Sequence, residues 1–196
     1  MTCKVAALVL AAGYSRRFGS DKRNQCLDDG QTLLEASLAL PCARLDEVWL
    51  VLRPGEPRPS GLPETIRVVQ SASTRLGLGH SIAAGAEQMA QASQADALAV
   101  FLADMPFVTP ATLDALLATC DAEHIGVPTH GGQPGHPVVF GRSFWPELCQ
   151  LAGDSGARAV LQRHAHAVRR VAVDDPGILL DIDRPADLSR GQHGLD

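Results

Sequence analysis

The segment from Leu10 to Arg23 combines small residues with a hydroxyl group and positive charge. Its small residues are Ala11, Ala12 and Gly13, its hydroxyl belongs to Ser15, and its cations are Arg16, Arg17, Lys22 and Arg23. Backbone N–H groups of small residues can approach an anion without a side chain in the way, and the hydroxyl group and the cations add further donors and charge. The pattern therefore suits a triphosphate. It is neither a P-loop nor a dinucleotide-binding fingerprint. A glycine turn with solvated arginines is the alternative.

A carboxylate, Asp104, follows directly after the apolar run Ala97–Ala103. A charge at the end of a buried strand is costly unless it is solvated, paired or bound to a metal. Mg²⁺ bound to phosphates needs a hard oxygen ligand of this kind. Capping of the next helix is a weak alternative, because Thr109 already fills that role.

A third acidic segment, Asp181-Ile182-Asp183-Arg184-Pro185, lies near the C-terminus. Alternation places Asp181 and Asp183 on the same face of an extended segment, and a second Mg²⁺ ligand could come from there. A helix cap before Pro185 explains Asp183 equally well.

Composition and charge exclude several classes of protein. The chain has 196 residues, 45% hydrophobic and 20% charged, which is typical of a chain that buries a core and not of a disordered one. Its 17 basic and 22 acidic residues give a net charge of -5, which argues against a nucleic-acid partner bound on a broad basic face. The apolar stretches are too short to cross a bilayer, and the N-terminus lacks the pattern of a signal peptide. The five cysteines have no C-x-x-C spacing, so we expect free thiols in a cytoplasmic protein with no membrane partner.

Short strand-like runs alternate with helix-like ones along the chain. Strands are predicted at Val5–Leu10, Glu47–Leu52, Ile66–Val69 and Ala97–Ala103, and in the more mixed last third at Gly126–Val127, Pro137–Phe140 and Val168–Val173. Helices are predicted at Thr32–Leu40, with Thr32 and Glu35 spaced as a capping box, at Ser81–Ala92, at Pro110–Cys120 after Thr109, and near Ser143–Leu151 and Ala157–His164. This alternation predicts an α/β fold with a doubly wound, mostly parallel sheet. No linker divides the chain, so we expect one domain over residues 1–190 and a loose tail at 191–196.

Four motifs resemble one known family. The segment Leu10–Lys22 resembles the L-A-[AG]-G-x-S-x-R-[MF]-G-x-x-K signature of MobA-like nucleotidyltransferases. The similarity continues in order through Gly77-Leu78-Gly79-His80-Ser81, Ala103-Asp104-Met105-Pro106 and Asp181-Ile182-Asp183-Arg184-Pro185. It spans nearly the whole chain. The resemblance implies a Rossmann-like sheet and a nucleoside triphosphate substrate.

Within that family the sequence is most similar to the cytidylyl branch, which acts on molybdenum cofactor. Ala12 stands where the guanylyl branch typically has glycine, and its methyl group would narrow the base site towards a pyrimidine. The segments from Gly132 to Pro137 and from Gly153 to Arg158 also resemble this branch, in which they lie on the pterin side of the cleft. The residues that we expect there are His136, Asp154 and Arg158, although Asp154 and Arg158 could instead form a local (i, i+4) salt bridge.

The resemblance implies transfer of CMP from CTP to the terminal phosphate of a molybdopterin-type cofactor, with release of pyrophosphate. Leu10, Ala11, Ala12, Gly13, Ser15, Arg16, Lys22, Gly79, His80 and Ser81 would bind the nucleotide, Arg17, Lys22 and Asp104 would be catalytic, and Asp104 and Asp183 would hold Mg²⁺. A molybdoenzyme or its maturation chaperone is a possible partner. The alternatives are a related transferase that uses GTP or another phosphate acceptor, and a non-catalytic protein that delivers the cofactor.

Overall fold

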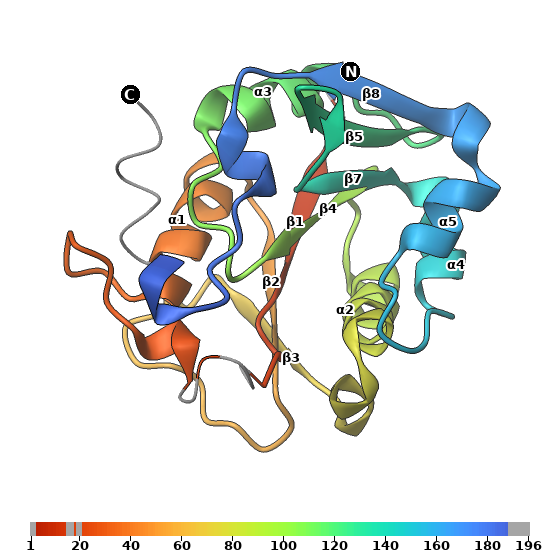
Figure 1. Cartoon of the computed structure of the whole chain (residues 1–196). Helices are drawn as coiled ribbons and strands as arrows, with labels where there is room; N and C mark the ends of the chain where they lie inside the picture. Colours follow the sequence, from red (N-terminus) through yellow and green to blue (C-terminus); the bar gives the residue numbers. More distant parts are fainter. Residues whose placement is uncertain (1–2, 15–17, 19–20, 188–196) are drawn as a thin grey trace.

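The structure of the chain is a computed structural model, which describes residues 3–14, 18 and 21–187. The described strands form one eight-stranded sheet in the order β3-β2-β1-β4-β7-β5-β6, and β8 also pairs with β5 (Figure 1). The strands are β1 (Val5–Leu10), β2 (Val48–Leu52), β3 (Arg67–Gln70), β4 (Ala97–Leu102), β5 (Ile125–His130), β6 (Gln133–Pro134), β7 (Val138–Gly141) and β8 (Val168–Ala172). The tail predicted at 191–196 lies outside the described residues.

The first half of the sheet is parallel and the second half is mixed. Parallel pairs join β1 to β2, β2 to β3, β1 to β4 and β5 to β8. β7 runs antiparallel between β4 and β5, and the short β6 is antiparallel to β5. The predicted α/β fold with a mostly parallel sheet is confirmed, and the mixed part corresponds to the less regular last third of the sequence.

Helices cover both faces of the sheet (Figure 1). They are α1 (Leu33–Arg44), α2 (Leu78–Ala92), α3 (Pro110–Thr119), α4 (Trp145–Leu148) and α5 (Arg158–Arg163). Thr32 and Glu35 form the predicted capping box at the start of α1, and Thr109 caps α3 before Pro110. α2 begins three residues before the predicted Ser81, after Gly77, whose φ of 130° suits only glycine.

The two faces of β1 pack into different clusters. Leu8 and Leu10 pack in the cluster that α2 contributes to, whereas Ala7 and Val9 pack in the one shared by α1 and α3. This alternation is what a strand buried on both faces requires. A third, smaller cluster joins Phe18, Leu27, Leu33 and Ile182, and so holds the C-terminal segment against the segment that follows β1.

Strands β1 and β4 end at the same edge of the sheet, because Leu10 pairs with Leu102. The strand order changes direction here, since β2 and β3 lie on one side of β1 and β4 lies on the other. Such a switch point is where open parallel sheets bind ligands. The segments that begin at Ala11 and Ala103 therefore leave the sheet side by side.

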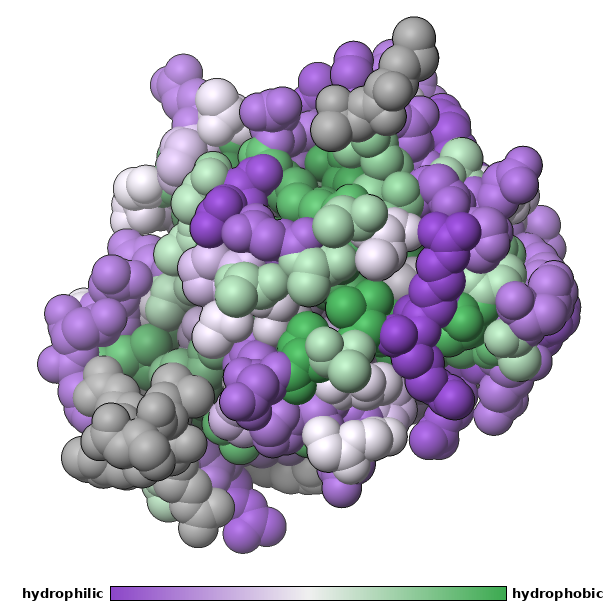
Figure 2. All heavy atoms as spheres, turned by 90° about the horizontal axis from the view of Figure 1, so that it is seen from above, coloured by the Kyte–Doolittle hydropathy of each residue, from purple (hydrophilic) through white to green (hydrophobic). Residues whose placement is uncertain are grey.

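Seen from above, the molecule has hydrophilic residues around its rim and hydrophobic ones nearer the middle (Figure 2). Among the described residues, none of the helices has the length and apolar character needed to span a bilayer.

Candidate active site

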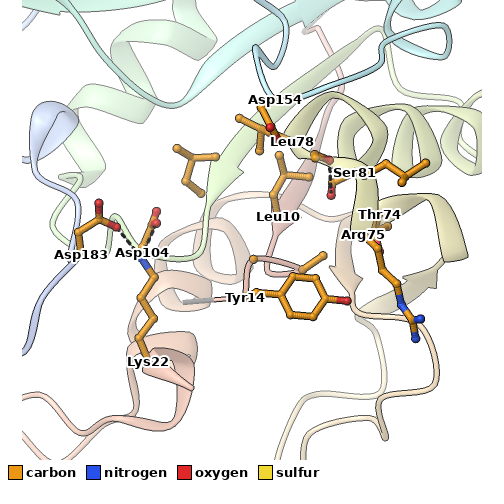
Figure 3. A pocket seen from close by; sticks show the side chains of 15 residues that line it. Leu10, Tyr14, Lys22, Thr74, Arg75, Leu78, Ser81, Asp104, Asp154 and Asp183 are labelled. Carbon is orange, nitrogen blue, oxygen red and sulfur yellow. Dashed lines mark hydrogen bonds and ion pairs between the residues drawn. The ribbon is translucent and has the colours of Figure 1, made fainter. Parts of the chain in front are cut away.

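A pocket of about 510 Å³ lies at the switch point between β1 and β4. Its lining residues come from the loop after β1, the start of α2 with the 3-10 helix Ala72–Leu76, the end of β4, and the C-terminal segment. They are Leu10, Ala12, Gly13, Tyr14, Lys22, Thr74, Arg75, Leu76, Gly77, Leu78, Ser81, Leu102, Asp104, Asp154 and Asp183. Figure 3 shows Lys22, Asp104 and Asp183 together on one wall, with Leu78, Ser81 and Arg75 across the pocket.

The Lys22 ammonium binds both predicted carboxylates at once. Its Nζ donates to Asp104 Oδ2 at 2.8 Å, to Asp183 Oδ1 at 3.1 Å and to the Ile182 carbonyl oxygen at 2.7 Å. These three bonds use all the donors of an ammonium group. Burial alone would lower the pKa of Lys22, but the Asp104 and Asp183 carboxylates outweigh it and hold this pKa above its ordinary value. Lys22 is therefore a cation that balances two negative charges.

One oxygen of this cluster has no hydrogen-bond partner among the described residues. Asp104 Oδ1 is buried and accepts no hydrogen bond from residues 3–14, 18 and 21–187. A buried carboxylate oxygen of this kind is a suitable ligand for a hard divalent cation. No group of three or more potential metal ligands occurs in residues 3–14, 18 and 21–187. Two carboxylates, those of Asp104 and Asp183, nevertheless fit Mg²⁺, because this ion usually binds one or two carboxylates and takes its other ligands from phosphates and water.

The loop after β1 contributes fewer amides than its sequence predicts. Ala12 and Gly13 line the pocket, and a Cβ placed on Gly13 would have no atom within 4 Å. Ala11 does not line it, because its side chain packs on the α1 and α3 face and its N–H donates to Val51 O at 2.9 Å. The amide of Ala11 continues the sheet ladder and is not free for phosphate. Ser15, Arg16 and Arg17 lie outside the described residues.

Arg23 lies beside the loop after β1, as its place in the sequence predicts, but it does not line the pocket. Arg23 is only 5% exposed, and its guanidinium donates to Ala11 O and to the carboxylates of Asp21 and Glu56. A carboxylate two residues before it and another across the loop draw the guanidinium inward, so it does not reach the pocket.

Only one of the three predicted residues at the start of α2 lines the pocket. Ser81 does, with its Oγ donating to Gly77 O at 3.3 Å. Gly79 instead packs against the segment of Ala152 and Gly153. Its N–H donates to Gly153 O at 2.8 Å, and a Cβ on it would lie 2.7 Å from Ala152 O. His80 is half-buried and is not part of the lining.

A second, more apolar pocket of about 270 Å³ adjoins the first and shares Leu10, Leu78 and Leu102 with it. His136 and Arg158 line it. Nδ1 of His136 is buried and has no hydrogen-bond partner within the described part of the chain. Burial also lowers the pKa of His136, which favours the neutral imidazole.

The three residues predicted on the acceptor side are therefore divided between the two pockets. Asp154 lines the first pocket, close against Gly77, where an added Cβ would lie 2.3 Å from Asp154 Oδ1. Arg158 begins α5 and lines the second. Asp154 precedes that helix, so the two do not have the helical (i, i+4) relationship that the local salt bridge requires.

Sequence reasoning missed the pocket residues Tyr14, Thr74, Arg75 and Leu76. The usable signal for Tyr14 was its place in the sequence, directly after Gly13 of the loop. Thr74, Arg75 and Leu76 lie in a short 3-10 helix that has no apolar periodicity to reveal it.

Comparison with known proteins gives consistent matches over most of the chain. The model of the MobA-like NTP transferase domain matches residues 7–168. The purine catabolism protein PucB of Bacillus subtilis is 34% identical over 191 residues, which cover 90% of each chain. A probable molybdenum cofactor guanylyltransferase of Chloroflexus aggregans is 35% identical over 114 residues, 57% of this chain and 51% of that one.

A solved structure agrees with the fold over almost the full length. The crystal structure of Rv0371c from Mycobacterium tuberculosis has a TM-score of 0.83 at 30% identity and covers 97% of this chain and 98% of that one. A crystal structure of Rv0371c in complex with manganese has a TM-score of 0.76 at 28% identity, with the same coverage.

Proposed function

The chain belongs to the MobA-like NTP transferase family, and from this premise we propose that it transfers CMP from CTP to the terminal phosphate of a molybdopterin-type cofactor, releasing pyrophosphate. The observation that carries the proposal is the cluster of Lys22, Asp104 and Asp183 in a pocket that a second, apolar pocket adjoins. In this proposal the first pocket would bind the nucleotide and the second its acceptor.

The chemistry requires positioning and charge neutralisation more than proton transfer. A phosphate monoester is already largely ionised at neutral pH, so the nucleophile needs no general base. In-line attack on the α-phosphorus expels pyrophosphate, and catalysis comes from alignment and from cations near the phosphates. The loop around Gly13, with Arg17, would hold the β- and γ-phosphates. Lys22 would exchange part of its contact with the carboxylates for the α-phosphate.

Asp104 and Asp183 would hold Mg²⁺. The bound ion would neutralise charge that develops on the transferred phosphate. The unpartnered Oδ1 of Asp104 supports this assignment, because it leaves one oxygen of the carboxylate for an ion while Lys22 contacts the other.

Base choice is assigned to the region around Ala12. Ala12 lines the pocket beside the end of β1, and its methyl group would reduce the space there. A smaller site favours a pyrimidine over a purine, so CTP is the proposed donor. GTP is the second candidate, and the observation that favours it is the name of a relative, a probable molybdenum cofactor guanylyltransferase.

The acceptor is assigned to the second pocket. Its apolar walls suit a flat heterocycle, and Arg158 at its edge suits a phosphate. The neutral His136 would orient the heterocycle by hydrogen bonding through its unpartnered Nδ1. The loaded cofactor would pass in the cytoplasm to a molybdoenzyme or its maturation chaperone.

The test measures pyrophosphate release from CTP and from GTP by the purified protein with Mg²⁺ and molybdopterin. We expect release with CTP to exceed release with GTP. A preference for GTP would replace the cytidylyl assignment with the guanylyl one. Tight nucleotide binding without any release would favour a non-catalytic carrier instead.

A further inference from the structure

Arg53, which follows β2, binds the loop after β1 (residues 11–14, here called the nucleotide loop) without lining the pocket. Its Nε donates to Gly13 O at 3.2 Å, and its Nη2 donates to the same oxygen. Its Nη1 donates to Asp21 Oδ2 at 2.9 Å, and its guanidinium carbon lies 5.0 Å from the centre of the Tyr14 ring. The Arg53 side chain is 20% exposed, so these bonds form in a partly desolvated place.

Arg23 binds the same loop at the carbonyl of Ala11, two residues before the carbonyl that Arg53 binds. Its Nη1 donates to Ala11 O at 2.8 Å, and its Nε and Nη2 donate to the Asp21 carboxylate at 2.9 and 2.5 Å. Both carboxylate oxygens of Glu56 also accept from it. Asp21 is thus shared by two guanidinium groups, which ties the two contacts into one network.

Binding these carbonyl groups determines where the next amides point. In a planar trans peptide the C=O and the N–H of the following residue point in opposite directions. Holding Ala11 C=O therefore directs Ala12 N–H away from Arg23, and holding Gly13 C=O directs Tyr14 N–H away from Arg53. Ala12 and Tyr14 line the pocket, whereas the two arginines do not.

We propose that Arg53 and Arg23 are positioning residues, which hold the carbonyls of Gly13 and Ala11 so that the amides of Tyr14 and Ala12 can bind the triphosphate chain of the substrate. The identity of that ligand rests on the proposed function. Neither arginine touches the ligand. Each acts through one peptide group, so their geometry matters and not only their charge.

The test compares Arg53→Lys and Arg53→Ala with the wild type and with Arg58→Ala. Lysine keeps the charge but cannot reach Gly13 O and Asp21 together with a fixed fork. Arg58 is the matched control, because it lies with Arg53 in the loop between β2 and β3. It donates to the carbonyls of Ile66 and Pro63 but not to the nucleotide loop. The probe is inorganic triphosphate, whose affinity is measured by calorimetry, and urea unfolding checks that each variant is folded.

We expect both Arg53 variants to bind inorganic triphosphate about tenfold more weakly and Arg58→Ala to bind it as the wild type does, since about one or two amide-to-phosphate hydrogen bonds are misdirected. In the wild type, the amide protons of Ala12 and Tyr14 should move downfield in NMR spectra when triphosphate is added. In Arg53→Lys the Tyr14 shift should be reduced.

Two results would overturn the inference. One is wild-type affinity in Arg53→Lys, which would mean that only the charge matters. The other is the absence of any shift of the Ala12 and Tyr14 amide protons when triphosphate is added to the wild-type protein. This second result does not depend on the folding of a variant. Failure of the proposed function gives a different pattern: inorganic triphosphate binds with the expected amide shifts, but neither CTP nor GTP yields pyrophosphate.

Discussion

Lys22 Nζ lies 2.8 Å from Asp104 Oδ2, although 82 residues separate the two in the sequence. The same ammonium lies 3.1 Å from Asp183 Oδ1. One cation and two anions therefore form a single electrostatic unit on the pocket wall. Removing a member of either sign leaves the others unbalanced, so substitutions within the unit should not be additive.

Lys22→Ala should reduce turnover about a hundredfold, because loss of a preorganised cation costs about 3 kcal/mol of barrier. The measurement is the rate of pyrophosphate release, with urea unfolding to show that the variant is folded. Lys4→Ala is the matched control, since Lys4 is the other lysine of the chain and lies outside the pocket. Normal turnover in Lys22→Ala would remove this residue from the catalytic site.

Asp104→Asn and Asp183→Asn should each abolish Mg²⁺-dependent turnover, because in the proposed mechanism both carboxylates hold one ion. The double variant should be little worse than either single one. Nucleotide affinity without Mg²⁺ should stay the same or improve, since a negative charge has been removed near the phosphates. Turnover and affinity are measured for all three with Mg²⁺ and with a chelator. Asp114→Asn, at an exposed position in α3, controls for the change of charge. Mg²⁺-dependent turnover at the wild-type rate in either single variant would contradict the shared ion.

The elements that place this site follow from local patterns. Val5–Leu10 is a continuous apolar run that ends at small residues, and the observed strand has the same bounds. Asp104 could be placed at the pocket because a buried strand stops just before it. In both cases a buried parallel strand leaves a strong local signal, and its carboxyl end is where the chemistry lies.

Other features depend on contacts that no local pattern contains. A cation near a glycine loop can face a ligand or a carboxylate, and only the fold brings Glu56 against Arg23. The amide of Ala11 was expected at the phosphates, but pairing with Val51 occupies it. These outcomes were decided by which segments come together, so a single sequence did not reveal them.

Ala12→Gly should weaken the proposed preference for CTP and allow some use of GTP. It removes the methyl group of a residue that lines the pocket, and one such group discriminates by only about 1–3 kcal/mol, so the shift should be partial. The measurement is the ratio of kcat/KM for CTP to that for GTP. Ala11→Gly makes the same change on the opposite face of the chain and should leave this ratio unchanged. If the ratio is the same in Ala12→Gly, the base is selected elsewhere, for example around Ser81.

Asp21→Asn should lower the free energy of unfolding at pH 7 and make that free energy depend less on pH in the acid range. Hydrogen bonds from Arg23 hold the pKa of Asp21 down to about 2, from an ordinary value of 3.8. Because the folded-state pKa lies below the unfolded one, the ionised carboxylate stabilises the fold above about pH 4, and this contribution of about 1–2 kcal/mol is lost as the pH falls towards 2. Urea unfolding from pH 7 to pH 2 should therefore show wild type and variant converging in acid. Asp46→Asn changes the charge at an exposed position and should run parallel to the wild type. A constant difference between Asp21→Asn and wild type over this range would mean that the Asp21 carboxylate does not stabilise the arginine network through its charge.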